Sequence, residues 1–87
     1  MNELDILRKK IDDIDKELLK VFEKRLFVCK EIAEFKKQNG LSVLDKEREK
    51  AVIQSRCELC DIPEAEKFIK CVIEISREYQ ERLLDKK

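Results

Sequence analysis

Apolar residues recur every three or four positions through the first 38 residues of the chain, the period of an amphipathic α-helix. One heptad series holds Leu4, Leu7, Ile11, Ile14, Leu18, Val21, Arg25, Val28, Ile32 and Phe35. All of its members except Arg25 are apolar, which indicates a seam that packs against another helix. The pattern predicts one helix from residue 2 or 3 to about Gln38. Asn39 and Gly40 should end it, because both residues tolerate a left-handed backbone.

Two shorter helices are predicted after the first. Following a loop, the second covers about residues 46–58, with Asp45 as its N-cap. The third is expected from about Ile62 to Leu84, with Asp61 as its cap and Pro63 in its first turn. Its seam contains Ile62, Ala65, Ile69, Val72, Ser76, Tyr79 and Leu83. We therefore expect an all-α chain with three helices, the N-terminal one the longest.

Composition agrees with helices and removes several classes of function. The 87 residues predict one domain, residues 1–87, and 46% of them are charged. Basic and acidic residues are equal in number, 20 each, and interleaved, so a nucleic-acid partner is not expected. No apolar run approaches the roughly 20 residues of a membrane span. The N-terminus does not resemble a signal peptide, so we expect a cytoplasmic protein without a membrane partner.

The four cysteines do not form a recognisable metal or redox centre. Cys57 and Cys60 have C-x-x-C spacing, but Cys29 and Cys71 are isolated and the chain has no histidine. Zinc would need a second pair of ligands, and a redox pair would want a βαβ context. We expect reduced thiols, buried or half-buried, and no metal or cofactor.

The length of the first helix predicts a second copy of the chain. About 34 residues make a helix roughly 50 Å long. A compact globule of this chain length is only about 30 Å across. The helix must therefore overhang with its apolar stripe unburied. A homodimer in which the long helices pair is the simplest way to cover that stripe.

Polar residues interrupt the apolar seams of the helices at related places. Arg25 takes a seam position, and Lys36 lies on the same face of the first helix. Ser76 interrupts the third helix, with Gln80 one turn further on. On the second helix, one face carries Asp45, Arg48, Glu49 and Val52. A single buried polar residue can fix the register of a coiled coil. Three interrupted helices fit better with a pocket for a small anion, because burying an unpaired cation costs several kcal/mol.

Arg8 flanks the seam too far away to join this pocket within one chain. It lies about 25 Å from Arg25 and about 42 Å from Lys36 along the helix axis. If two copies pair antiparallel with a midpoint near Leu19, the partner's Arg8 faces roughly residue 31, between the two cations. The dimer would then hold two equivalent sites, each completed by an arginine from the other chain.

Such a pocket lacks the groups that most enzyme mechanisms use. The sequence has no histidine, no glycine-rich phosphate loop and no recognisable set of metal ligands. No cysteine has an evident partner base. What remains is to hold an anion in one shape and to stabilise developing charge with fixed donors. A unimolecular rearrangement needs no more than that.

Four motifs carry a resemblance to a known family over essentially the whole chain: "LRKKIDDIDKELLKVFEKR", "AEFKK", "LDKERE" and "IEISREYQ". They resemble the all-helical, AroQ-type chorismate mutases. The resemblance implies an intertwined homodimer of three-helix chains. It also implies the Claisen rearrangement of chorismate to prephenate, on the shikimate route to phenylalanine and tyrosine. Many relatives are fused to a second catalytic or regulatory domain. The 87 residues here show no such domain, so a monofunctional isomerase is expected.

The resemblance also implies roles for particular residues. Arg25 and the partner's Arg8 would pair with the two carboxylates of the substrate. Lys36 would serve a carboxylate and the ether oxygen of the breaking C–O bond, and Gln80 would be the second donor to that oxygen. These four are the expected catalytic residues. The remaining expected contacts are Glu49 and the backbone at Asp45 for the ring hydroxyl, Arg48 and Ser76, and Ile32 and Ile73 as apolar walls.

Two other interpretations stay open on the sequence. An isochorismate pyruvate-lyase uses a similar anion pocket on the same scaffold for a different pericyclic step, although the "LDKERE" motif favours the mutase. A helical dimerisation module without catalysis would make the polar seam residues dispensable. In that case, replacing Arg25 by Leu should stabilise the dimer and remove no function.

Overall fold

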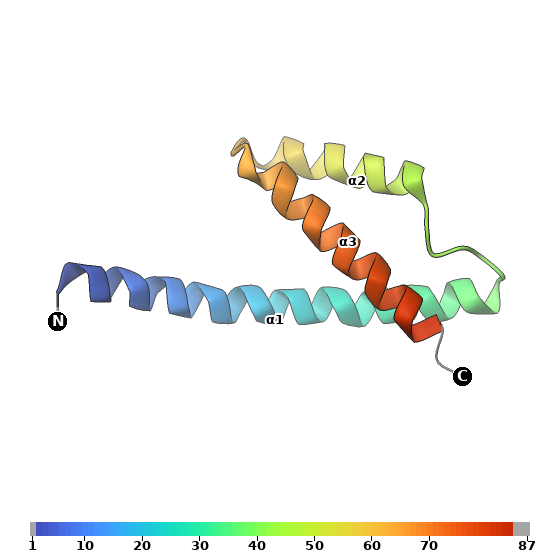
Figure 1. Cartoon of the computed structure of the whole chain (residues 1–87), viewed down its shortest axis with the longest axis horizontal. Coiled ribbons are helices and arrows are strands. Elements are labelled where there is room, and N and C mark those ends of the chain that lie inside the picture. Colours follow the sequence, from blue (N-terminus) through green and yellow to red (C-terminus); the bar gives the residue numbers. More distant parts are fainter. Residues whose placement is uncertain (1, 85–87) are drawn as a thin grey trace.

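A computed structural model describes residues 2–84, and this part of the chain contains three helices and no strand. They are α1 (Glu3–Gln38), α2 (Lys46–Leu59) and α3 (Glu64–Leu84) (Figure 1). The predicted all-α fold with a long N-terminal helix is confirmed. The two ends of the predicted domain 1–87, residue 1 and residues 85–87, lie outside the described residues. Within residues 2–84, no helix is long and apolar enough to cross a membrane.

Local interactions and backbone preferences set both ends of α1 and the start of α2. The side-chain oxygen of Asn2 accepts a hydrogen bond from the backbone N–H of Asp5 at 2.8 Å, which caps α1. The chain leaves α1 through Gly40, whose φ of 66° lies in the left-handed region that glycine enters without strain. Asp45 accepts from the N–H of Arg48 at 3.0 Å and caps α2, as the sequence predicted.

The start of α3 differs from the prediction. The helix begins at Glu64 rather than Ile62, so Asp61 lies three residues before it and is not its cap. The carbonyl of Ile62 instead accepts from the N–H of Ala65 at 2.9 Å, which closes a turn around Pro63. Proline favours such a turn because its φ is already fixed near the required value.

α3 is the element that holds the chain together. It crosses the C-terminal half of α1 and packs against both α1 and α2 (Figure 1). The buried side chains of α3 are Val72, Ile73, Ser76 and Gln80, so its inner face is half polar. A small core whose central helix buries a hydroxyl and an amide is unusual, because buried polar groups need partners.

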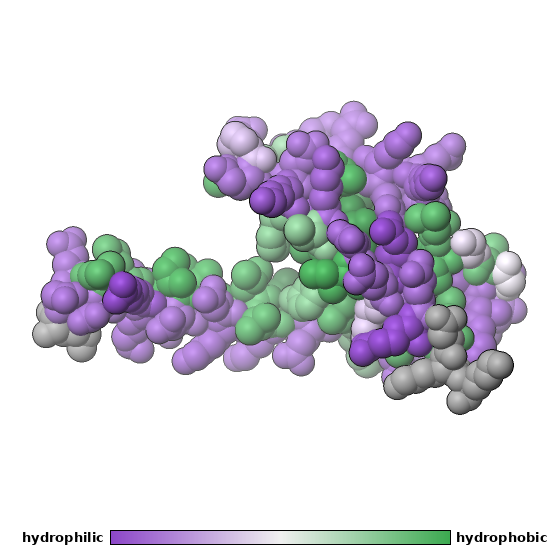
Figure 2. Space-filling view, viewed as in Figure 1, coloured by the Kyte–Doolittle hydropathy of each residue, from purple (hydrophilic) through white to green (hydrophobic). Residues whose placement is uncertain are grey.

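The N-terminal half of α1 extends away from the other helices (Figure 1). Every residue from 2 to 21 is exposed, and the chain measures 56 × 30 × 14 Å. The apolar members of the predicted heptad keep exposed fractions between 42% and 62%. Those between residues 4 and 21 form apolar patches along the free half of α1 (Figure 2). The predicted overhang and its unburied stripe are confirmed.

α1 also has a second apolar face, which the heptad pattern did not reveal. Cys29 and Ala33 are its buried residues, 6% and 1% exposed. Each follows a heptad residue by one position, Val28 and Ile32 respectively. The helix therefore packs within its own chain through the side next to the heptad seam. The apolar residues of the seam stay exposed.

The cysteines are less enclosed than predicted. All four are free thiols; Cys29 is buried and Cys57 half-buried, as expected. Cys60 and Cys71 are exposed, so the prediction was wrong for these two. Cys60 is the residue after α2, where the chain turns toward α3. Cys71 directly precedes the buried pair Val72 and Ile73 but is itself exposed.

Candidate active site

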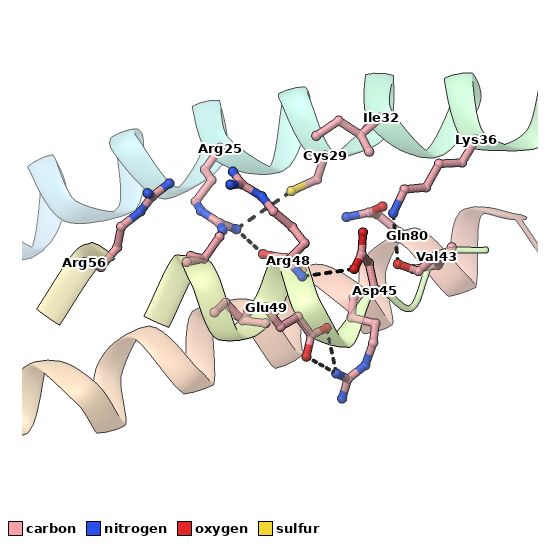
Figure 3. A pocket seen from close by; sticks show the side chains of 14 residues that line it. Arg25, Cys29, Ile32, Lys36, Val43, Asp45, Arg48, Glu49, Arg56 and Gln80 are labelled. Carbon is pink, nitrogen blue, oxygen red and sulfur yellow. Dashed lines mark hydrogen bonds and ion pairs between the residues drawn. The ribbon is translucent and has the colours of Figure 1, made fainter. Parts of the chain in front are cut away.

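A cavity of about 330 Å³ is lined by all three helices and by the loop before α2 (Figure 3). This volume falls at the lower end of the range for small-molecule sites, about 300–1,000 Å³. α1 contributes one wall, α2 the facing wall, and α3 joins the two. The cavity therefore exists only because α3 holds α1 and α2 apart.

The structure brings nine of the ten predicted substrate-binding residues to this cavity: Arg25, Ile32, Lys36, Asp45, Arg48, Glu49, Ile73, Ser76 and Gln80. The tenth, Arg8, is not among the lining residues. It is an exposed residue of the overhanging half of α1, about 25 Å before Arg25 along the axis. A single chain therefore does not deliver Arg8 to the cavity.

Five further lining residues were not selected from the sequence: Cys29, Val43, Val52, Arg56 and Arg77. Helical spacing could have found two of them, Cys29 and Arg56. Cys29 lies one turn after Arg25, and Arg56 lies one turn after Val52, which already shared a face with the predicted residues. Val43 belongs to a loop, where no period exists to place it.

Arg25 is oriented by neutral groups. Its Nη1 donates to the hydroxyl of Ser76 and, at 3.8 Å, to the Sγ of Cys29. Ser76 is 4% exposed, and its own proton goes to the carbonyl of Val72 at 2.7 Å. The hydroxyl therefore turns its lone pairs to the guanidinium. No carboxylate in residues 2–84 forms an ion pair with Arg25, so its charge is held in place without being neutralised.

Lys36 and Gln80 reach into the other end of the cavity (Figure 3). The Nζ of Lys36 donates to the carbonyl of Val43 at 2.9 Å, which leaves two of its three protons for a ligand. Gln80 is 9% exposed, and its Oε1 is buried without a hydrogen-bond partner in the described residues. A buried polar atom without a partner costs about 1–3 kcal/mol. Only a ligand group that donates to Oε1, such as a hydroxyl, would recover that cost, whereas the NH2 group of the same amide donates to a ligand acceptor.

Glu49 is held from α3 by an arginine that the sequence analysis missed. The Nη1 of Arg77 donates to both carboxylate oxygens of Glu49 at 2.9 Å. The two side chains are 29% and 25% exposed. Bonding to Glu49 raises the pKa of Arg77 above its already high value, so the guanidinium stays charged. This pair joins α2 to α3 and fixes the direction of the Glu49 carboxylate at the cavity wall.

The cavity is cationic although the chain is neutral overall. Five basic side chains line it, Arg25, Lys36, Arg48, Arg56 and Arg77, against the acidic Asp45 and Glu49. The chain as a whole has 20 basic and 20 acidic residues. A cleft with one sign of charge and low-dielectric walls concentrates ions of the opposite sign. The arrangement suits a small ligand with more than one negative charge.

The same arrangement limits the chemistry that these side chains can perform. No group of three or more cysteine or carboxylate side chains in residues 2–84 is placed to hold a metal ion. The cavity offers fixed cations at one end and a cation with an amide at the other. Such groups bind an anion in a defined shape and stabilise charge that develops on an oxygen.

Fold and cavity together define a small helical protein with a cationic pocket. A model of the family described as chorismate mutase type II matches residues 7–81. That range contains every residue that lines the cavity. The chain therefore belongs to the chorismate mutase type II family, and the resemblance seen in the four motifs is confirmed.

Three curated relatives are similar over part of the chain. The chorismate mutase of Methanocaldococcus jannaschii is 43% identical over 54 residues, 62% of this chain and 54% of that protein. The T-protein of Haemophilus influenzae is 41% identical over 56 residues, 64% of this chain and 15% of that protein. The T-protein of Enterobacter agglomerans is 43% identical over 54 residues, 62% and 14%. The match thus spans about half of the first relative and a small part of the others. No solved structure matches the chain.

Proposed function

We propose that this protein is a chorismate mutase that converts chorismate to prephenate in the biosynthesis of phenylalanine and tyrosine. One observation carries the proposal. In a member of the chorismate mutase type II family, a cationic cavity presents Arg25 and Lys36 without carboxylate partners in the described residues. Chorismate is a small dianion with a ring hydroxyl and an ether oxygen. It offers acceptors for these cations and for the amide of Gln80.

The first task of the site is to hold chorismate in a compact chair. Arg25 binds one carboxylate, and the partner's Arg8 binds the other. Glu49 and the backbone at Asp45 bind the ring hydroxyl, while Ile32 and Ile73 pack against the ring faces. Arg48 and Ser76 complete the contacts, Ser76 through its hydrogen bond with Arg25. Fixing the two reacting carbons in contact removes the entropy that the flexible substrate would otherwise lose at the transition state.

The second task is to stabilise charge on the ether oxygen. The C–O bond breaks while a C–C bond forms within the same molecule, so no proton or electron moves to the protein. Negative charge grows on the ether oxygen as the C–O bond lengthens. Lys36 and Gln80 donate to this oxygen, and their bonds strengthen most in the transition state. No cofactor takes part in this proposal.

We further infer that two copies form an intertwined homodimer through the heptad seam of α1. The exposed seam gives the reason, because an apolar stripe of this length is covered in stable soluble proteins. Antiparallel pairing near Leu19 brings the partner's Arg8 opposite the cavity. Each site then draws residues from both chains. Residues 1–87 act as one domain of that dimer, in the cytoplasm, where the pathway operates.

The test is a continuous ultraviolet assay. Purified protein is mixed with chorismate, and loss of its diene absorbance is followed beside the Arg25→Ala variant, with prephenate identified as the product. We expect turnover by the wild type and a loss of about two to three orders of magnitude in the variant. Circular dichroism of both proteins serves as the control for folding.

Each alternative has its own outcome in this experiment. A folded wild-type protein that leaves chorismate unchanged would remove the mutase proposal. Release of pyruvate from isochorismate by that protein would instead support the lyase. Full activity of a folded Arg25→Ala variant would remove the role of Arg25 while leaving the reaction in place.

A further inference from the structure

Arg56 is a cation of the cavity that neither the four motifs nor the proposed chemistry uses. It lies in the last turn of α2 and lines the cavity together with Val52, one turn before it. In Figure 3 its side chain points toward α1 on the side of Arg25 that is remote from Lys36. The guanidinium groups of Arg25, from α1, and Arg56, from α2, thus lie toward the same end of the cavity.

The immediate surroundings of Arg56 repeat those of Arg25. The Nη1 of Arg56 donates to the hydroxyl of Ser55 at 2.9 Å, and that hydroxyl donates to the carbonyl of Val52 at 3.0 Å. Both arginines therefore bind a serine that is hydrogen-bonded back to its own helix. No carboxylate in residues 2–84 forms an ion pair with Arg56. By contrast, Lys70 on the outer surface pairs with Glu66 at 3.4 Å.

We propose that Arg56 is a further carboxylate-binding residue of this cavity, next to Arg25. The inference rests on the proposed function in taking chorismate as the ligand. A carboxylate has two oxygens, and the planar guanidinium group matches that geometry better than an ammonium does. Two guanidinium groups held by neutral acceptors at one end of a cleft form a site for one carboxylate.

The position of Arg56 also predicts which kinetic constant it affects. Lys36 lies about 16 Å beyond Arg25 along α1. Arg56, on the far side of Arg25, therefore does not contact the ether oxygen. It binds the substrate and the transition state equally, so its loss raises KM and leaves kcat unchanged. Since Arg56 is an exposed residue, we expect a rise of about three- to tenfold at low salt that shrinks at high salt.

The experiment compares Arg56→Gln with Lys50→Gln. Both variants remove one positive charge from α2, but Lys50 does not line the cavity. KM and kcat for chorismate are measured at about 20 mM and 500 mM NaCl. The proposal expects a raised KM for Arg56→Gln only, with partial recovery in Arg56→Lys. An unchanged KM in Arg56→Gln, or an equal rise in Lys50→Gln, would overturn it.

Calorimetric titration with chorismate separates this inference from the proposed function. Turnover with unchanged KM in Arg56→Gln removes the role of Arg56 alone. If the wild type binds chorismate without converting it, the mutase proposal fails. Weaker binding by Arg56→Gln would in that case still support the carboxylate site. Absence of both binding and turnover in the folded wild type overturns both proposals.

Discussion

At the scale of single residues, the cavity is organised by neutral acceptors that position cations. Ser76 and Cys29 accept from Arg25, and the carbonyl of Val43 accepts from Lys36. A carboxylate in these places would have held the cations more tightly but would have cancelled their charge. The fold instead keeps half-buried positive charges uncompensated, which costs stability unless an anion binds. This cost is easiest to understand if binding such an anion is the function of the cavity.

Lys36→Ala tests the donor at the reacting oxygen, with Lys37→Ala as the matched control. Both lysines lie in the last turn of α1, but only Lys36 lines the cavity. Losing a donor to a developing charge costs about two to three orders of magnitude in kcat. We expect that loss for Lys36→Ala and wild-type turnover for Lys37→Ala. Similar turnover in the two variants would remove Lys36 from the chemistry.

Gln80 predicts the pH dependence of the reaction. Its amide donates without titrating, so wild-type kcat should stay level between about pH 6 and pH 8. In Gln80→Glu the new carboxyl can donate only while protonated, and its ionised form would repel the charge growing on the ether oxygen. The kcat of that variant should therefore fall as the pH rises. A steep fall in the wild type, or a level profile in the variant, would contradict the donor role.

At the scale of helices, the described residues 2–84 form three elements with two packed contacts, α1 with α3 and α2 with α3. α1 and α2 instead face each other across the cavity. The ion pair between Glu49 and Arg77 joins α2 to α3 and has two consequences. It fixes α2 relative to α3 beside the cavity and sets the direction of a carboxylate that we assign to the ring hydroxyl. Its loss should affect both the fold and the substrate.

A double-mutant cycle on this pair checks the assignment. Arg77→Gln should lower the Tm slightly and raise the KM for chorismate, because Glu49 loses the hydrogen bonds that fix the direction of its carboxylate. Glu49→Gln should also lower the Tm, since it leaves the charge of Arg77 without its partner. The double variant should lose less Tm than the two single variants together. Additive losses of Tm would mean that the pair does not couple α2 to α3. Arg82→Gln removes a positive charge from α3 outside the cavity and serves as the control.

Helix positions were readable from the sequence wherever local chemistry decides them. Asn2, Asp45 and Gly40 set helix ends through their own side chains or backbone freedom, and the predicted ends agree with the structure. Asp61 failed as a cap because the turn around Pro63 uses the carbonyl of Ile62 instead. A proline that is compatible with either start leaves such a boundary undecided from sequence alone.

The candidate site was predictable to the extent that polar residues broke an apolar period. Arg25 and Ser76 stood out because a seam position predicts an aliphatic side chain. Arg56 and Arg77 did not stand out, since charged residues are ordinary on the surface of a helix. Their place at the cavity depends on the angle at which α3 crosses the other two helices. That angle follows from tertiary packing, which no single helix specifies.

At the scale of the whole molecule, the free half of α1 decides whether the site is complete. Residues 2–21 are exposed, and Arg8 lies among them, outside the cavity of its own chain. An exposed apolar stripe of this length is typical of a surface that binds another protein chain. Pairing two copies antiparallel would cover the stripe and deliver the missing arginine in one step. Stability of the dimer and activity would then depend on the same contact.

Mixing two inactive variants tests this shared site. Arg8→Ala and Arg25→Ala chains are each expected to be nearly inactive alone. Unfolded together and refolded as a mixture, about half of the dimers contain one chain of each kind, and each of these has one intact site. Activity should therefore return to about one quarter of the wild-type value. No recovery in a mixture of folded dimers would mean that Arg8 does not act across the interface.

A second mixture shows whether any recovery has this cause. Arg25→Ala and Lys36→Ala remove residues that line the same cavity of one chain. Every site in their mixed dimer lacks one or the other, because exchanging chains moves Arg8 but not these two residues. This pair should stay inactive after refolding, although its dimers form as readily. Recovery in the first mixture only would therefore mean that each site takes Arg8 from one chain and its other cations from the other. Recovery in both would point to contamination or to an exchange of whole helices between chains.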